Sequence, residues 1–163
     1  MGVLTRSRSI DDIVADLDPA KPIAVISCNN CVRASGSGGE GVWEKFCDEL
    51  TARGFTIEQR ALITNPCSRG YFEDFEIPSS VKTVVLMACR GGNAALQSAH
   101  PGVEVVETTE TLGLFISSKA DKTLKLALPF PGYEKLAGKD FKLGNSREIY
   151  PETKLPIGEE VSR

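Results

Sequence analysis

Short apolar runs alternate with amphipathic segments along most of this chain, which predicts an α/β protein. Pro22–Cys28 is apolar almost throughout, as is typical of a strand that a parallel sheet buries on both faces. Phe55–Thr64 and Val81–Ala88 predict two more strands, and the second of these has the clearest strand pattern in the chain. Val103–Glu107 predicts a fourth strand.

Helical periodicity appears between these runs. Ser9–Leu17 gathers its apolar residues on one helical face, with Ser9 as the expected N-cap. Gly41–Arg53 predicts a longer helix that ends at Gly54, and Asn93–Ala99 begins another. Alternating strands and helices with short connections predict a Rossmann-like three-layer α/β domain, with a mostly parallel sheet and right-handed crossovers.

The pattern divides the chain into three parts: an N-terminal helix in residues 1–20, an α/β cysteine-containing domain in 21–117, and an extended tail in 118–163. Thr111–Ser117 fits either a helix or a short strand, and Thr123–Leu128 alternates like an exposed strand. From Pro129 onward, prolines and glycines predict an irregular tail that wraps the domain or a partner.

Composition narrows the classes of function. The 163 residues are 41% hydrophobic and 25% charged, as in ordinary globular domains. A net charge of −3 with scattered basic residues argues against a nucleic-acid partner. No apolar stretch approaches the roughly 20 residues that cross a bilayer, and aspartates interrupt the N-terminus where a secretory signal needs an apolar core. We therefore expect a cytoplasmic protein with reduced thiols and no membrane partner.

Four cysteines follow the predicted strands. Cys28 and Cys31 form a Cys-x-x-Cys pair after the first strand, Cys67 follows the second strand, and Cys89 follows the third. The carboxyl ends of parallel strands share one edge of a sheet, so these four residues are expected to converge. Thiolates suit zinc and iron–sulfur clusters, and four of them complete either ligand set.

The spacing favours one of these two groups. A zinc ribbon has two Cys-x-x-Cys pairs, whereas this chain has one pair and two lone cysteines. We therefore predict one 4Fe–4S iron–sulfur cluster, with zinc as the alternative.

Other interpretations of the cysteines stay open. Cys47 lies inside a predicted helix and is expected to be a core residue, and further cysteines could likewise be buried apolar residues. Cys28 and Cys31 could also form a thioredoxin-like dithiol. Such a pair opens a helix, whereas Val32–Gly41 predicts a glycine- and serine-rich loop.

Glycines and arginines flank the cysteines. Glycine leaves backbone N–H groups free to approach sulfur, and such hydrogen bonds tune a cluster's potential. The loop Ser35–Gly41 precedes a helix and could cradle an anion, but it matches no complete phosphate motif and is expected to fold over the cysteine site. The arginines could offset thiolate charge, meet an acidic partner or flavin phosphate, or simply be solvated. The predicted cofactor-binding residues are Gly36, Gly38, Gly39, Arg69, Arg90 and Gly91.

Three segments, Ile23–Cys31, Asn65–Gly70 and Val84–Gly92, resemble the small iron–sulfur or zinc companion subunit of methylenetetrahydrofolate reductase, which also occurs as a C-terminal domain of that enzyme. The resemblance covers about residues 21–117. It implies that Cys28, Cys31, Cys67 and Cys89 are the ligands. It also implies that the chain binds a flavin-containing reductase subunit of one-carbon metabolism and relays electrons to it or stabilises it.

The same segments are similar to the delta iron–sulfur subunit of methyl-viologen-reducing hydrogenase, which also transfers electrons. Ala94 stands where that family has a further cysteine, and this chain has no cysteine after Cys89. The resemblance therefore supports one centre and no second cluster.

An electron-transfer accessory protein is the leading interpretation, and no catalytic residue is predicted. A structural zinc module that mediates assembly is the first rival. The second is an enzyme that uses thiol redox chemistry or binds flavin or folate. Assembly into a homo-oligomer is compatible with each of these.

Overall fold

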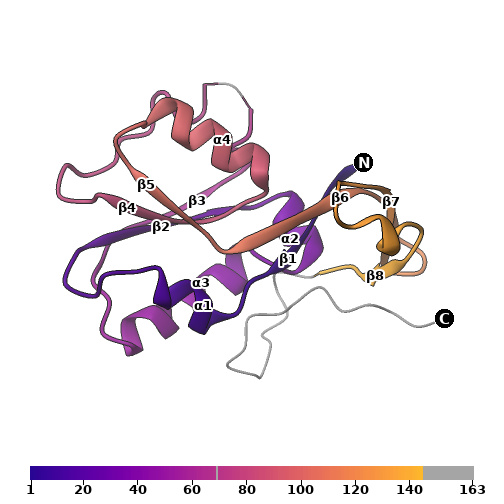
Figure 1. Cartoon of the computed structure of the whole chain (residues 1–163), viewed down its shortest axis with the longest axis horizontal. Helices are drawn as coiled ribbons and strands as arrows, with labels where there is room; N and C mark the ends of the chain where they lie inside the picture. The colour runs from indigo at the N-terminus through magenta and orange to yellow at the C-terminus, as the bar shows by residue number, and fades with distance from the viewer. Residues whose placement is uncertain (69, 145–163) are drawn as a thin grey trace.

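The computed structural model describes residues 1–68 and 70–144, and it shows a mixed α/β protein with two sheets (Figure 1). The parallel sheet has the strand order β3-β2-β4-β5, and the antiparallel sheet has the order β1-β6-β7-β8. The strands of the parallel sheet are β2 (Ile23–Cys28), β3 (Ile57–Ile63), β4 (Thr83–Met87) and β5 (Glu104–Glu107). Those of the antiparallel sheet are β1 (Gly2–Ser7), β6 (Thr109–Ser118), β7 (Thr123–Pro129) and β8 (Asp140–Lys142).

Helices cover both faces of the parallel sheet. The helical elements are α1 (Ile10–Ala15), α2 (Cys31–Ser35), α3 (Glu40–Ala52), α4 (Arg90–Ala99) and the 3-10 turn η1 (Glu134–Leu136). Apolar residues of α1 and α3 pack on one face, where Phe46 and Leu50 are fully buried. Leu96 of α4 and Phe72 of the β3–β4 connection pack on the other face. The antiparallel sheet has its own core around Leu112 and Leu126.

β2 and β4 form the centre of the parallel sheet, and every residue of both strands is buried. From β2 the chain passes through α3 outward to β3, whereas from β4 it passes through α4 outward to β5 on the other side. The strand order therefore reverses between β2 and β4. A crevice opens beyond the carboxyl ends of the strands at such a reversal, and this is where α/β sheets bind ligands.

The two sheets are joined by one nearly continuous stretch of chain. β5 runs through Thr108 into β6, so this stretch leaves the parallel sheet and enters the antiparallel one (Figure 1). The N-terminal strand β1 pairs antiparallel with β6. Its other side meets α2, where the backbone N–H of Thr5 donates to Ser35 Oγ at 3.1 Å. The antiparallel sheet thus closes against the carboxyl edge of the parallel sheet.

The structure confirms the helix after Ser9, whose Oγ accepts from the backbone N–H of Asp12 at 3.1 Å, and the four strands of the parallel sheet. The strand expected over Thr123–Leu128 is confirmed as β7. Two expectations are wrong: residues 2–7 form β1 rather than part of a helical segment, and the stretch after Pro129 contains η1 and β8 rather than only irregular chain. The rest of the predicted tail, residues 145–163, lies outside the described residues.

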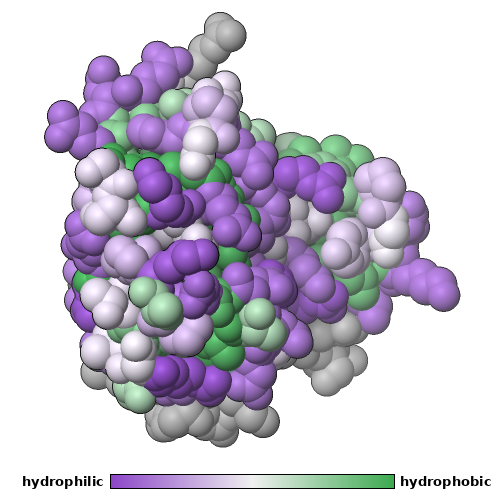
Figure 2. Space-filling view, turned by 60° about the vertical axis from the view of Figure 1, so that its left-hand side comes forward, coloured by the Kyte–Doolittle hydropathy of each residue, from purple (hydrophilic) through white to green (hydrophobic). Residues whose placement is uncertain are grey.

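Figure 2 shows the side of the molecule at which the parallel strands begin. Hydrophilic residues dominate this surface, and hydrophobic residues are visible between the hydrophilic ones. Within residues 1–68 and 70–144, no helix has the length and apolar character needed to span a membrane.

Gly113 provides a test of the antiparallel sheet. Its φ is +153°, and a Cβ there would lie 2.2 Å from the carbonyl oxygen of Leu128 and 2.7 Å from Pro129 Cα. Because backbone atoms cannot yield as a flexible side chain does, Gly113→Ala should lower the free energy of unfolding by about 1–3 kcal/mol. Gly102→Ala is the matched control, since no atom lies within 4 Å of its would-be Cβ. Equal urea midpoints for the two variants would contradict this packing.

Candidate functional site

Cys28 occupies the carboxyl end of β2 and is 5% exposed. The backbone N–H groups of Asn30 and Asn65 donate hydrogen bonds to its sulfur. The side-chain amide of Asn30 also donates to the Asn65 side-chain oxygen, so the turns after β2 and β3 are tied together at this thiol. Asn65 has a φ of +56°, a left-handed conformation that asparagine adopts more readily than most residues.

Cys31 is the first residue of α2 and is half-buried. Its Sγ faces β1, because a Cβ added to Gly2 would lie 3.4 Å from this sulfur. The same Cβ would lie 2.7 Å from Cζ of Phe115 on β6. The end of the antiparallel sheet therefore forms a wall beside Cys31, and Gly2 is needed because the wall stands so close.

Glycines at the start of α4 bring Cys67 and Cys89 together. Cys89 caps α4, and a Cβ on Gly91 would lie 3.4 Å from Cys67 Cβ and 3.7 Å from Cys89 Sγ. A Cβ on Gly92 would lie 3.7 Å from Pro66 Cγ. The turn that carries Cys67 can approach α4 this closely because neither glycine has a side chain.

The four thiols affect one another electrostatically. Burial raises the pKa of the Cys28 thiol, and thiolates on Cys31 and Cys89 would raise it further, while the hydrogen bonds from Asn30 and Asn65 lower it. Burial also raises the pKa of Cys67, followed by the effects of Cys89 and Cys31. Each of the four residues therefore has two of the others near enough to influence it electrostatically.

The four cysteines differ in how exposed they are to solvent. Cys28 and Cys89 are buried, Cys31 is half-buried, and Cys67 is exposed, although its neighbours cover part of its thiol. The site is thus closed toward the sheet and open toward the turn after β3.

The residues present fit a thiophilic group. Several thiolates gathered in one partly buried place repel one another, and a bound cation or cluster would remove that cost. N–H groups directed at Cys28 would further stabilise its thiolate. Among the described residues, no three His, Cys, Asp or Glu side chains are grouped so as to hold a single metal ion. The cluster and zinc assignments stay predictions.

The predicted glycine loop is packed within the protein. Gly36, Gly38 and Gly39 are buried, and a Cβ on Gly38 would lie 2.7 Å from Val32 Cγ2. The backbone N–H of Gly39 donates to Ser27 Oγ at 3.0 Å. These contacts explain the glycines without a ligand, so a cofactor-binding role for them stays a prediction.

Cys31–Ser35 forms a short helix, α2, rather than the beginning of a loop. The expectation of a continuous loop over residues 32–41 was therefore wrong. Cys31 does open a helix, as the second cysteine of a thioredoxin-like dithiol could, so the dithiol interpretation stays open.

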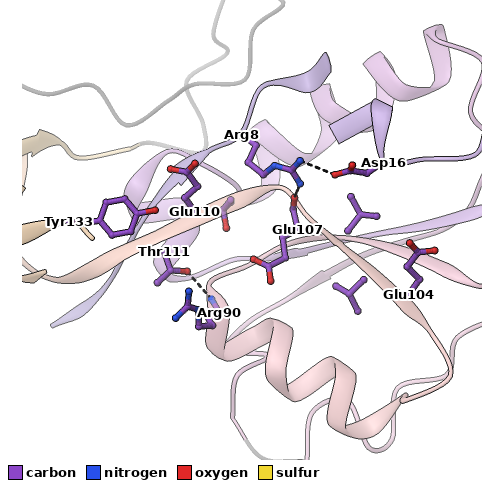
Figure 3. A pocket seen from close by; sticks show the side chains of 11 residues that line it. Arg8, Asp16, Arg90, Glu104, Glu107, Glu110, Thr111 and Tyr133 are labelled. Atoms are coloured by element: carbon purple, nitrogen blue, oxygen red, sulfur yellow. Dashed lines mark hydrogen bonds and ion pairs between the residues drawn. The ribbon is translucent and has the colours of Figure 1, made fainter. Parts of the chain in front are cut away.

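Arg90, the residue after Cys89, lines a pocket of about 510 Å³ (Figure 3). Its backbone N–H donates to Thr111 Oγ1 at 2.9 Å, and its guanidinium has no partner among the described residues. Arg8, the other arginine there, pairs with Asp16 at 2.8 Å. The lining also includes three glutamates, Glu104, Glu107 and Glu110. These carboxylates would repel a phosphate, so an anion-binding role for Arg90 rests on its unpaired guanidinium alone. Arg69 lies outside the described residues.

Cys47 is fully buried in α3, as expected for a core residue, and burial raises its pKa to about 11. Sequence reasoning missed three residues that shape the site: Gly2, Asn30 and Asn65. The two asparagines could have been suspected from their places in Cys-Asn-Asn-Cys and Asn-Pro-Cys. Gly2 had no signal, because it reaches Cys31 only through the pairing of β1 with β6.

Comparison of the chain with protein-family models, with curated proteins and with solved structures found no match. The resemblance to the reductase companion and to the hydrogenase subunit therefore rests on the cysteine-containing segments alone.

The rates at which the cysteines of the metal-free protein are alkylated test these differences in exposure. Thiolate is the reactive form, so raised pKa values predict slow labelling that accelerates as the pH increases. Cys67 should label first, and Cys47 should lag it by at least about tenfold because it reacts only through local opening. Site-resolved mass spectrometry under native conditions measures both rates. Equal rates for Cys67 and Cys47 would contradict the placement of these two residues.

Proposed function

We propose that this chain is an iron–sulfur accessory protein that transfers electrons to or from a methylenetetrahydrofolate reductase-type flavoprotein. The observation that supports the proposal is the mutual electrostatic influence of Cys28, Cys31, Cys67 and Cys89, which lie at or beyond the carboxyl ends of β2, β3 and β4. We assign the parallel sheet and its helices to a Rossmann-like three-layer domain, in which this edge is the usual ligand site.

In this proposal the four cysteines hold one 4Fe–4S cluster, which when bound supplies one-electron redox chemistry. Cys28 and Cys89 anchor it on the buried side, and the backbone N–H groups of Asn30 and Asn65 stabilise the thiolate of Cys28. Cys67 lies on the exposed side. A partner that docks over the turn after β3 would therefore approach the centre through the least covered ligand.

The partner assignment comes from the resemblance and from the lack of any predicted catalytic residue. A centre held by four cysteines is suited to passing electrons to a cofactor on another subunit. A flavin accepts electrons singly or in pairs, so it is a suitable acceptor. The proposed setting is the cytoplasm, where the thiols stay reduced until they are loaded.

Metal analysis of anaerobically purified protein tests the proposal. We expect a brown protein with about four irons per chain. Cys89→Ser should lose most of this iron, because it removes a buried ligand next to Gly91. Cys47→Ala is the matched control and should retain the iron, since Cys47 lies in the core around α3.

Two outcomes would contradict the iron–sulfur assignment. A colourless anaerobic protein with one zinc would favour the structural assembly module. A protein that binds neither metal, with four reactive thiols, would favour the dithiol enzyme. Both outcomes are read from the same sample by metal analysis and the visible spectrum.

A further inference from the structure

The outer edge of β3 is the longest open sheet edge in the described part of the chain. β3 has seven residues and only one neighbour, β2. The other edges are shorter or covered: β5 has four residues, β8 has three, and β1 is met by α2. A long strand edge with unpaired N–H and C=O groups is a template for another strand.

The backbone of β3 leaves a defined set of groups pointing outward. The carbonyl of Ile63 accepts from the N–H of Asn29, so it points toward β2. Backbone direction alternates along a strand, which turns the groups of Leu62 and Arg60 outward. Glu58 is the extra residue of an irregularity in the pairing, because Ile23 and Ala24 of β2 pair with residues 57 and 59. No backbone hydrogen bond joins this edge to another described element.

The charges on this edge are self-complementary. Glu58 and Arg60 flank Gln59 and are both exposed. When two copies of this strand run antiparallel about Gln59, Glu58 of each copy stands opposite Arg60 of the other. Opposite charges directly across a strand pair are stabilising, and the twofold symmetry forms this pair twice.

We propose that two copies of this chain join through β3, antiparallel and centred on Gln59, so that their parallel sheets form one continuous sheet. In this register the backbone groups of position 60 of one copy, which point outward, exchange hydrogen bonds with those of position 58 of the other. The surface is distinct from the cysteine site, and the proposal does not depend on the proposed function.

The contacts that Glu58 and Arg60 make within one chain leave both side chains able to pair with a second copy. Arg60 lies 3.9 Å from Asp48 and donates to Thr51 Oγ1 at 3.3 Å, and its side chain remains 44% exposed. Glu58 accepts one hydrogen bond, from Ser80 Oγ at 2.5 Å. The contacts of Arg60 are long and lie on the surface, so they are weak. The hydrogen bond from Ser80 is short, but it uses only part of the accepting capacity of the Glu58 carboxylate, which keeps further capacity for a partner.

Gln59 supports the choice of axis. Its Nε2 donates to the carbonyl of Glu76 at 2.8 Å, whereas its buried Oε1 has no hydrogen-bond partner among the described residues. In the dimer the two Gln59 side chains face each other across the twofold axis. When both side chains rotate, the Oε1 of each accepts the amide hydrogen of the other that the Glu76 carbonyl does not use. A hollow of about 860 Å³ lies beside Gln59, lined partly by Phe75 and Ile77, and the second copy would narrow it.

Sedimentation analysis over a concentration series tests this pairing. We expect the wild-type chain to pass from 17.6 kDa to twice that mass as concentration rises. Glu58→Arg and Arg60→Glu should each weaken the dimer by at least about tenfold, because each places like charges opposite one another. The double variant Glu58→Arg/Arg60→Glu exchanges the charges and should restore the wild-type dissociation constant within about threefold.

Lys135→Glu, on η1, is the control that matches the charge change of Arg60→Glu and should leave dimerisation unchanged. Circular dichroism establishes that each variant is folded, and the double variant keeps the test valid if one single variant is not. A wild-type chain that is monomeric up to about 1 mM would overturn the proposal. So would a dimer that neither single substitution weakens, or a double variant that stays as weak as the single ones.

Discussion

The pairing of β2 with β4 is the interaction on which the rest of the structure depends. Both strands are buried along their whole length, and each has a parallel neighbour on both sides, so their direction and register are strongly constrained. Because the chain leaves β2 and β4 toward opposite edges, their carboxyl ends lie at a reversal of strand order. Cys28 and Cys89 follow directly from this arrangement, since each ends or follows one of these two strands.

Cys67 and Cys31 are positioned relative to the central strands by glycines and by the pairing of strands far apart in the sequence. Gly91 lets the turn after β3 reach α4, which brings Cys67 beside Cys89. The pairing of β1 with β6 brings Gly2 to Cys31 and closes the site on the side of the antiparallel sheet. The parallel and the antiparallel sheet, each with its own core, therefore both contribute to the cysteine site. Within this site Cys28 and Cys89, which end or follow the central strands, are the buried cysteines.

The sequence predicted what local pattern and strand direction determine. The apolar runs around residues 22–28 and 81–88 identified the central strands, and the cysteines after them predicted one shared edge. β1 escaped prediction because its partner, β6, lies about a hundred residues away and no local signal announces the pair. The alternation of Thr123–Leu128 predicted β7, whereas β8 escaped because the prolines and glycines after Pro129 suggested an irregular tail. The cofactor role of the glycine loop stays a prediction, and contacts with Val32 and Ser27 account for Gly38 and Gly39 without a ligand.

The central claim is that four thiols from the ends of three strands share one site, and differential alkylation during reconstitution tests it most directly. Iron and sulfide are added anaerobically in steps, and the reactivity of each cysteine is followed by mass spectrometry. Cys31 and Cys67 are the accessible members of the set, and they should lose reactivity together, in proportion to the iron bound. A loaded protein in which Cys67 still reacts at its metal-free rate would contradict the claim.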